Sequence, residues 1–415
     1  MKLLSLFSGC GGMDIGFEGS FICLKKSINK NLHPDWIEED LGIWVKLAPT
    51  CFETVFANDI LPEARTAWVN YFSSRKKNAA EIYHLESIVD LVKSAKAGNR
   101  IFPDDIDIIT GGFPCQDFSI SGKRLGFNSQ KSHLGTVLDE DEPSVENRGH
   151  LYMWMRDVVS IVKPKLFIAE NVKGLTNLAD VKQIIEHDFS TAANGGYIVI
   201  PAKVLHAADY GVPQSRERVI FFGFRRNALT AEAIEHLSGD FINNSFDPYP
   251  APTHSYTSNY KNTYPFVSCI DAFEGLEEPD RTDDLSQKYY SMAKYMGSHC
   301  QGQTEIKLNS IAPTIRSEHH GNIEFRRLSK ERGGKIDFEL EAGLSERRLT
   351  VRECARIQTF PDDYEFIIKK SNDMSSVSAS KAYKIIGNAV PCVLAYNIAK
   401  NIEAKWTLYF GEESK

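Results

Sequence analysis

Several features that would assign a chain to the exported, membrane-bound or metal-stabilised proteins are scarce in this sequence. No two of its eight cysteines form a CxxC pair, so their spacing indicates neither a zinc site nor a disulfide framework. No stretch approaches the roughly 18 apolar residues of a membrane span, and no basic region precedes a long apolar run near the start. We therefore expect free thiols, no metal and no membrane association, in a protein of the cytoplasm.

The chain also has no excess of basic over acidic residues. The formal net charge is -7, whereas phosphate binding depends on clustered lysine and arginine. The bulk charge argues mildly against a nucleic-acid ligand, so any such ligand must be inferred from local features.

The chain has 415 residues, and single hydrophobic cores stop growing at roughly 250–300 residues. Two domains are therefore expected. Apolar runs typical of buried strands occur at residues 2–7, 55–57, 106–110, 166–169 and 219–224, and helical patterns cover residues 62–72 and 152–162. This alternation predicts an α/β fold with a Rossmann-like, doubly wound, mostly parallel sheet that binds ligands at the carboxyl ends of its strands.

The alternation fades after Arg226. We assign residues 1–226 to a first domain, residues 227–379 to a second, smaller domain, and residues 380–415 to a segment that returns to the first. The second domain is expected to be irregular, because its sequence is rich in Pro, Asn, Tyr and Ser as far as Arg347.

A glycine-rich turn, residues 7–12, follows the first predicted strand. Glycines there let a ligand approach the backbone closely, although a merely tight turn would use them too. Asp59 ends the next strand, where an acidic residue suits a ribose diol. The structural alternative for Asp59 is a cap for the helix that begins near Pro62.

Two further strand ends carry reactive groups. Cys115 follows Gly111-Gly112-Phe113-Pro114, a turn that would present an exposed nucleophile. Glu170 ends another strand, where desolvation would raise its pKa and suit it to donate a proton, although a lone Glu there is more often a cap or an ion-pair partner. Arg216 and Arg218 precede the strand at 219–224; one would face the pocket and the other a nucleic-acid backbone, unless they only form salt bridges at an edge.

In this order, the motifs resemble those of the bacterial DNA cytosine-5 methyltransferases of restriction-modification systems. The motifs that carry the resemblance are FSGCGGMDIGFE (7–18), GGFPCQDFSISGKRLGF (111–127), AENVKGL (169–175), DYGVPQSRERV (209–219), RRLTVRECARIQTFPDDY (347–364) and AYKIIGNAVP (382–391). A weaker match, APTIRSEHHGNIEF, resembles the family's target-recognition region.

The resemblance implies roles for residues that match the motifs. Cys115 would be the nucleophile, Glu170 the acid that protonates cytosine N3, Arg218 the ligand of cytosine O2, and Arg216 a support for the pocket or a phosphate contact. The residues implied to line the cofactor or catalytic pocket are Phe7, Gly9, Cys10, Gly12, Asp59, Pro114, Leu151, Asn388 and Val390. Thr314, Ile315 and Arg316 would belong to the DNA-binding region.

The implied reaction transfers a methyl group from S-adenosylmethionine to C5 of a cytosine and leaves S-adenosylhomocysteine. Since C6 of a stacked base is inaccessible, the base must flip out of the duplex. The first domain would then be catalytic and cofactor-binding, and the second would be the target-recognition domain with its hinge. We expect double-stranded DNA as the partner of a monomeric enzyme; a cognate restriction endonuclease that acts on the same site without binding the enzyme is compatible with this.

Two insertions depart from the family pattern. One, at about 129–147, contains the acidic run Asp139 to Glu142, and the other, at about 25–50, is interpreted as a surface helix pair. The residue that contacts the adenine of the cofactor is left unassigned. His319, His320, Arg326 and Arg327 join Arg316 as candidates for reading DNA.

Three alternatives remain. A tRNA cytosine methyltransferase of the same fold would have a smaller recognition region than residues 227–347. An inactive DNA-binding regulator would typically lack the cysteine or the glutamate. A small-molecule methyltransferase would not need the Pro-Cys turn or the arginine pair.

Overall fold

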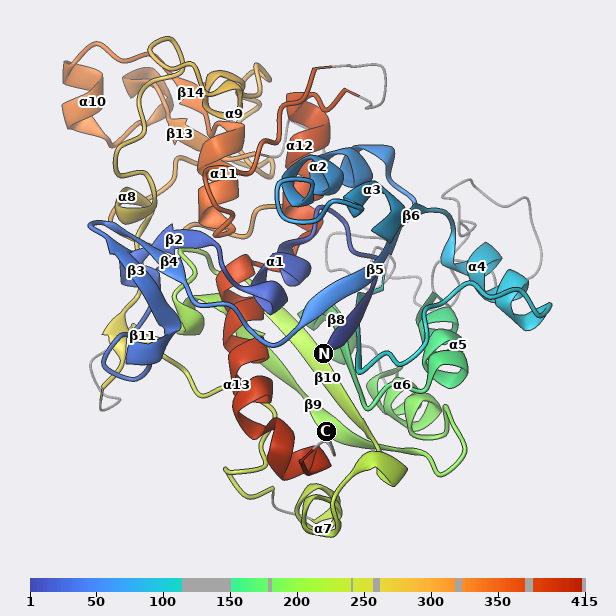
Figure 1. Ribbon diagram of the computed structural model, residues 1–415. Helices are drawn as coiled ribbons and strands as arrows, with labels where there is room; N and C mark the ends of the chain where they lie inside the picture. The colour runs from blue at the N-terminus through green and yellow to red at the C-terminus, as the bar shows by residue number, and fades with distance from the viewer. Residues whose placement is uncertain are drawn as a thin grey trace.

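The computed structural model describes residues 1–113, 151–177, 181–239, 242–256, 262–317, 323–369 and 376–412 (Figure 1). Its centre is a seven-stranded sheet. In spatial order the strands are β6 (Tyr83–Leu85), β5 (Glu53–Asp59), β1 (Lys2–Leu6), β7 (Ile108–Gly112), β8 (Leu166–Val172), β10 (Glu217–Arg225) and β9 (Tyr197–His206). Strands β6 to β8 are parallel to one another, and β10 runs antiparallel to both of its neighbours. The predicted doubly wound, mostly parallel sheet is confirmed.

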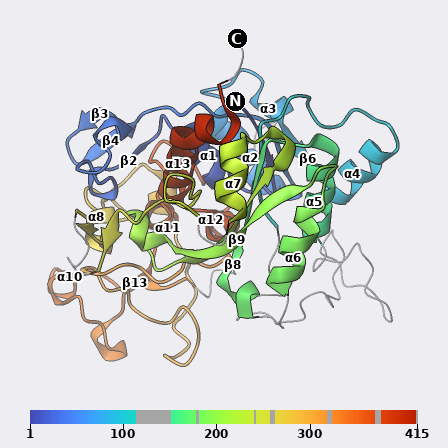
Figure 2. The ribbon, with the colours of Figure 1, turned by 90° about the horizontal axis from the view of Figure 1, so that it is seen from below.

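Alternate residues of the central strands enter two apolar cores, one on each face of the sheet. Leu3 of β1 belongs to one core, while Leu4 and Leu6 belong to the other. The first core also contains residues of α1 (Gly12–Glu18), α2 (Pro62–Phe72), α12 (Ala379–Asn388) and α13 (Cys392–Phe410), and the second contains residues of α4 (Ile88–Lys96), α5 (Leu151–Val162) and α6 (Val181–Ser190). Figure 2 shows α13 and α1 on one side of the sheet and α5 and α6 on the other. Both faces are therefore covered, and the helices predicted at 62–72 and 152–162 are confirmed.

The strand order reverses at the centre of the sheet. From β1 the chain moves outward to β5 and β6, then crosses back to β7 on the other side of β1. Such a reversal leaves a crevice at the carboxyl ends of the two central strands. The glycine turn after β1 and the GGFPC turn after β7 both begin at this edge.

The C-terminal segment forms two helices that are separated at Pro391, which cannot continue a helix hydrogen-bond ladder. The second of them, α13, packs closely on α1. A Cβ on Gly16 would lie 2.5 Å from the carbonyl oxygen of Cys392 and 2.4 Å from the Cβ of Ala395. Gly16 thus permits the contact through which α13 covers the sheet.

The insertion at about 25–50 is not a helix pair. It forms a three-stranded antiparallel sheet of β2 (Ile22–Leu24), β4 (Trp44–Leu47) and β3 (Ile37–Leu41), with β4 in the middle. In β4, Val45 and Leu47 are buried while Trp44 and Lys46 are partly exposed, so the residues alternate with the period of a strand. Gly42, at φ 87°, begins the two-residue turn between β3 and β4. This alternation is typical of a strand, so the helix pair expected for the insertion was wrong.

The second region has short elements, several of which surround a group of buried ion pairs, whereas its first helix packs against α13 and β9. The elements are α7 (Ala231–Ser238), β11 (His254–Ser255), β12 (Tyr264–Pro265), α8 (Cys269–Ala272), α9 (Leu285–Lys288), β13 (Phe325–Arg327), α10 (Asp337–Glu341), β14 (Arg347–Arg348) and α11 (Val351–Ile357); α3 (Ala79–Ile82) lies in the first region. Arg327 contacts Glu339 and Glu278 at 2.6 Å each, and Arg347 contacts Glu278 at 3.0 Å and Glu353 at 2.9 Å. Arg327 and Arg347 thus each have two carboxylate partners, as a buried charge requires.

Candidate active site

The glycine turn after β1 has an unusual backbone. Phe7, Gly9 and Gly11 all have left-handed φ angles, of 51°, 54° and 81°. For a phenylalanine this conformation is strained, and such strain is concentrated at functional sites. A Cβ on Gly9 would meet nothing within 4 Å, so open space lies beside the turn. A Cβ on Gly12 would instead lie 2.2 Å from the carbonyl oxygen of Val390, so Gly12 serves the close packing of α1 against the GNAVP segment.

Side chains from three other segments hold this turn. The carboxylate of Asp59 accepts hydrogen bonds from the backbone N–H of Gly9 and of Leu61, both at 3.0 Å. Burial raises the pKa of Asp59, while the hydrogen bonds from Leu61 and Gly9 oppose this shift. The hydroxyl of Tyr83 donates to the carbonyl of Gly9 at 2.9 Å, and that of Tyr364 donates to the carbonyl of Cys10 at 2.7 Å. The turn is therefore fixed before any ligand arrives.

Asp59 stays partly exposed, and its carboxylate, with about four acceptor positions, can take a further donor. It is not the side-chain cap of α2, because Leu61 occupies that position without a side-chain hydrogen bond. The Cys10 thiol is fully buried and donates to the carbonyl of Ile385 at 3.3 Å, so only the backbone of Cys10 is available to a ligand.

Glu170 lies at the end of β8, directly beside Gly112 of β7 in the strand register. A Cβ on Gly112 would lie 2.9 Å from Oε2 of Glu170, so the missing side chain makes room for the carboxylate. Burial raises the pKa of Glu170, and the charges of Arg218 and Arg216 only partly offset this. A buried carboxyl with a raised pKa at the end of a central strand is suited to donating a proton.

The two arginines have different partners. The Nε of Arg218 lies 2.7 Å from Oε1 of Glu170, in an ion pair at the carboxyl edge of the sheet. Arg216 is 1% exposed, and its guanidinium donates to the carbonyls of Ile315 at 3.0 Å and Gly387 at 2.8 Å. Since Arg216 does not reach the surface, these contacts favour support of the pocket over a phosphate contact.

The turn that leads to Cys115, the predicted nucleophile, is anchored where it begins. The side-chain amide of Asn171 donates to the carbonyl of Phe113 at 3.2 Å. Pro114 and Cys115 follow immediately and lie outside the described residues, as does the insertion at about 129–147. Leu151, 4% exposed, begins α5 where the description resumes.

Comparison with known proteins decides the family. The family model for C-5 cytosine-specific DNA methylases matches residues 1–404. The chain belongs to this family. The methylase is 32% identical to the type II methyltransferase M.BsuRI of Bacillus subtilis, over 100% of this chain and 81% of that protein. It is also 32% identical to M.BspRI of Lysinibacillus sphaericus, over 97% of this chain and 81% of that protein.

Solved structures agree on the fold. The S. pombe Dnmt2 methyltransferase superposes with a TM-score of 0.56 and 19% identity, covering 97% of this chain and 99% of that one. The methylase therefore has the fold of the S-adenosylmethionine-dependent methyltransferases. Its membership of the C-5 cytosine-specific DNA methylases gives its activity, the methylation of cytosine in DNA.

A chain of buried amides joins four motifs of the methylase behind the active site. The backbone N–H of Ile315 donates to Oε1 of Gln214 at 3.0 Å. Nε2 of Gln214 donates to Oε1 of Gln358 at 3.0 Å, and Nε2 of Gln358 donates to the carbonyl of Ile386 at 2.7 Å. Both glutamines are fully buried. The amide chain fixes the recognition segment and the GNAVP segment relative to β10.

The first residues expected in the DNA-binding region, Thr314 and Ile315, lie at one end of this amide chain. Thr314 donates to the carbonyl of Ser215 at 2.5 Å, and Ile315 is fully buried, so both anchor the segment. Arg316 is partly exposed, and its backbone packs against Gly387, where a Cβ would lie 2.2 Å from the Arg316 carbonyl carbon. Beyond Gly387, Asn388 is exposed and Val390 is 7% exposed.

Two other candidates for reading DNA are wrong. Arg326 and Arg327 are 8% and 1% exposed, and both pair with Glu339. A base edge cannot reach them, because burial of an arginine requires that its charge be paired inside. His319 and His320 lie outside the described residues.

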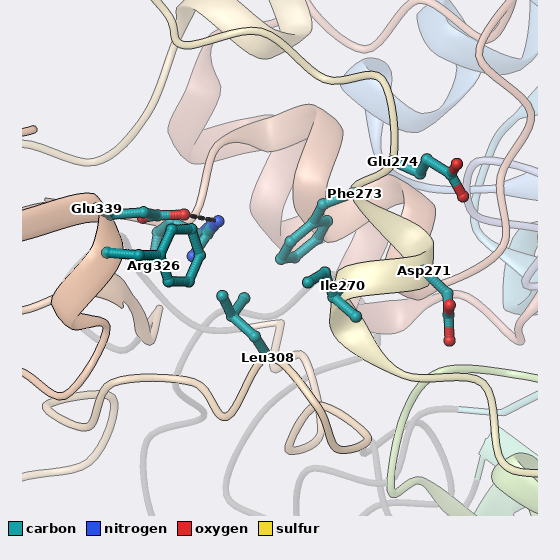
Figure 3. A pocket seen from close by; sticks show the side chains of 8 residues that line it. Ile270, Asp271, Phe273, Glu274, Leu308, Arg326 and Glu339 are labelled. Atoms are coloured by element: carbon teal, nitrogen blue, oxygen red, sulfur yellow. Dashed lines mark hydrogen bonds and ion pairs between the residues drawn. The ribbon is translucent and has the colours of Figure 1, made fainter. Parts of the chain in front are cut away.

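A cavity of about 290 Å³ lies beside this ion-pair group (Figure 3). Phe273, Ile270 and Leu308 line it, and the Arg326–Glu339 pair closes one side. Its residues come from α8 and the two residues after it, from α10, from β13 and from the loop that contains Leu308, and from none of the strands that carry Glu170 or Asp59. The cavity is therefore not assigned to the active site of the methylase.

Sequence reasoning missed five residues that position the site: Asn171, Gln214, Gln358, Tyr83 and Tyr364. Four of them stand within the quoted motifs, as AENV, PQSRERV, RIQTF and FPDDY. A polar residue inside an otherwise apolar motif is the signal that would have drawn attention to them, because buried polar groups need partners.

Within the described ranges, no three His, Cys, Asp or Glu side chains gather closely enough to hold a metal ion. None of the helices in the same ranges is long and apolar enough to cross a membrane.

Proposed function

We propose that the methylase transfers the methyl group of S-adenosylmethionine to a cytosine that is flipped out of a specific duplex sequence, through a covalent bond between Cys115 and C6. The observation that carries this proposal is the position of Glu170. Its buried carboxyl, with a raised pKa, lies at the carboxyl edge of the sheet, beside Arg218 and the glycine of the turn that leads to Cys115.

The residues at the edge of the sheet fit the methyl donor. Gly9 leaves open space beside a turn of fixed shape, and the partly exposed carboxylate of Asp59 can accept hydrogen bonds from a ribose diol. When bound, S-adenosylmethionine supplies an electrophilic methyl carbon. Phe7, Gly9 and the backbone of Cys10 would hold it, with Asp59 on the ribose and Pro114, Leu151, Asn388 and Val390 nearby.

The protein residues make the cytosine reactive. The Cys115 thiolate adds to C6 while Glu170 donates a proton to N3, so the electrons of the C5–C6 double bond become available at C5. Arg218 would hold O2 of the base and would keep Glu170 oriented. After C5 has taken the methyl group, loss of the C5 proton to a base restores the double bond and expels the thiolate, and the N3 proton returns to Glu170. The residues end in their starting states.

The partner is double-stranded DNA, and we propose that the enzyme acts as a monomer in the cytoplasm. A restriction endonuclease that cuts the same site is proposed by analogy with the relatives named as type II methyltransferases. We further propose the domain limits 1–226 for catalysis and 227–379 for target recognition and the hinge, with 380–415 returning to the first domain.

The covalent step provides the test. Duplex DNA with 5-fluorocytosine in place of cytosine should form a denaturation-resistant adduct when S-adenosylmethionine is present, because fluorine at C5 blocks the final proton loss. Mass spectrometry should place the bond on the peptide that contains Cys115, and Cys115→Ala should abolish the adduct while noncovalent DNA binding remains. An adduct on any of the other seven cysteines, or methylation by Cys115→Ala, would contradict the mechanism.

A further inference from the structure

A segment of the second region without regular secondary structure, residues 291–296, exposes alternate side chains. Met292 is 80% exposed, Met296 is 66% exposed, and Lys294 between them is exposed as well. The intervening Ala293 and Tyr295 are partly buried. Alternation with a period of two places the three outward side chains on one face of the chain. We call Met292, Lys294 and Met296 the Met-Lys-Met stripe.

The backbone behind the stripe is held by buried side chains. Arg348, 1% exposed, donates to the carbonyls of Ala293 at 2.9 Å and Lys294 at 3.3 Å. The backbone N–H of Met296 donates to Oε1 of Gln303 at 2.8 Å, and Gln303 is 2% exposed. Exposed methionines on a fixed backbone are costly to leave in water, which marks them as a contact surface.

Helix α12 connects the stripe to the active site. The hydroxyl of Tyr383 accepts a hydrogen bond from the backbone N–H of Ser291 at 3.2 Å. Four residues later on the same helix, about 6 Å along its axis, Gly387 packs against the backbone of Arg316 and accepts a hydrogen bond from Arg216. Ser291, which directly precedes the stripe, therefore contacts the same helix that packs against Arg316 and accepts the hydrogen bond from Arg216.

The residue composition around the stripe indicates which partner would bind it. The chain contains 55 acidic residues, yet none occurs among residues 285–304, where Lys288 and Lys294 stand with three tyrosines and the two methionines. Apolar side chains interleaved with lysine suit a polyanion that also presents apolar groups. Duplex DNA has both, since phosphates attract lysine and base edges offer apolar contacts such as the thymine methyl group.

We infer that the Met-Lys-Met stripe contacts the target DNA and contributes to the choice of sequence, with Met292 and Met296 on base edges and Lys294 on a phosphate. Arg348 acts as a positioning residue that holds the stripe. This inference rests on the proposed DNA methylation and names a surface of the enzyme that would contact the DNA.

The test measures methyl transfer to unmethylated bacteriophage DNA by the full chain. The double variant Met292→Ala, Met296→Ala should raise KM for DNA about tenfold or more, leave kcat within about twofold, and increase methylation at sites that differ from the main one by one base pair. Lys294→Ala should instead reduce the slope of log KM against log salt concentration by about one, without changing the methylated sites. Phe338→Ala, exposed in the same region, and Lys330→Ala serve as matched controls and should change neither quantity.

The outcomes distinguish failure of the inference about the stripe from failure of the proposed function. If the wild-type chain methylates the DNA but the stripe variants behave like Phe338→Ala and Lys330→Ala, the stripe is not a DNA contact and the proposed function stands. If the wild-type chain leaves the DNA unmethylated, the proposed function fails and the inference fails with it. Thermal unfolding and binding of S-adenosylmethionine should match the wild type in every variant, because the substituted side chains are exposed.

Discussion

The Nε of Arg218 lies 2.7 Å from Oε1 of Glu170, although the two residues belong to different strands, β10 and β8. The antiparallel register of these strands places Arg218 opposite Val172, at the edge where β8 ends. The ion pair orients the carboxyl, while burial keeps its pKa raised. Orientation and acidity of the proposed proton donor thus have separate structural causes, and each can be tested.

Replacing Glu170 by glutamine should slow single-turnover methyl transfer by about a hundredfold or more, because the amide cannot supply the proton for N3. The wild-type rate should also fall as the pH rises through the raised pKa of Glu170, since the deprotonated form cannot donate. Quench-flow measurements at several pH values check both results. Binding of DNA and of S-adenosylmethionine should be unchanged, and a variant as fast as the wild type would show that the acid lies elsewhere.

The pair Gly112→Ala and Gly111→Ala tests the space for this carboxyl. A Cβ on Gly112 would meet Oε2 of Glu170 at 2.9 Å, whereas one on Gly111 would meet the flexible Met155 side chain at the same distance. We expect Gly112→Ala to reduce kcat about tenfold or more by displacing the acid, as a misplaced catalytic group does. Gly111→Ala should instead lower the melting temperature and keep most of the activity. Equal losses of activity would refute the assigned role of Gly112.

The amide pair Gln214 and Gln358 should be energetically coupled. Substitution of either by leucine leaves buried backbone groups without partners and should reduce the free energy of unfolding by about 1–3 kcal/mol. The double variant should lose less than the sum, with a coupling of about 0.5–3 kcal/mol. Urea titrations of the four proteins measure this coupling, with exposed Gln301→Leu as the control. Strictly additive losses would mean that the two amides act independently.

The ion-pair group predicts an acid-sensitive contribution from Glu278. Burial raises the pKa of Glu278. The hydrogen bonds and charges of Arg347 and Arg327 lower this pKa by more than burial raises it, so the net pKa is about 2. A carboxyl whose pKa is lower in the folded protein than in the unfolded protein stabilises the fold at pH values above the unfolded pKa of about 4.3. This stabilisation is lost as the pH falls toward 2. Glu278→Gln should therefore cost about 2–3 kcal/mol at pH 7, because two buried arginines lose a partner.

Thermal unfolding from pH 7 to pH 3 should show the wild type and Glu278→Gln converging as the pH falls. The control is Glu38→Gln, whose partner Lys46 is exposed, so the loss should be below about 1 kcal/mol. A difference between the wild type and Glu278→Gln that stays constant over this range would contradict the assigned ion pairs.

The sequence by itself determined the sheet and the positions of the polar groups at its edge. Short apolar runs that end in Gly112, Asp59 and Glu170 predicted both the buried strands and the groups at their carboxyl ends. These predictions succeeded because strand periodicity is local, and because parallel strands bring their carboxyl ends to a common edge whatever the loops do.

Only the tertiary structure decided which polar groups are buried and with what. The side-chain amide of Gln214 donates to that of Gln358, which is 144 residues away in the sequence. Arg326 and Arg327 are buried because they form ion pairs with Glu339 and Glu278. Nothing near an arginine in the sequence shows whether its charge will be paired. The insertion at 25–50 became a sheet for a similar reason, since Val45 and Leu47 are buried and Tyr396 of α13 donates to the carbonyl of Ala48 at 3.0 Å. Partners remote in the chain set these outcomes, because burial of a charge or an amide is favourable only when the fold supplies its partner.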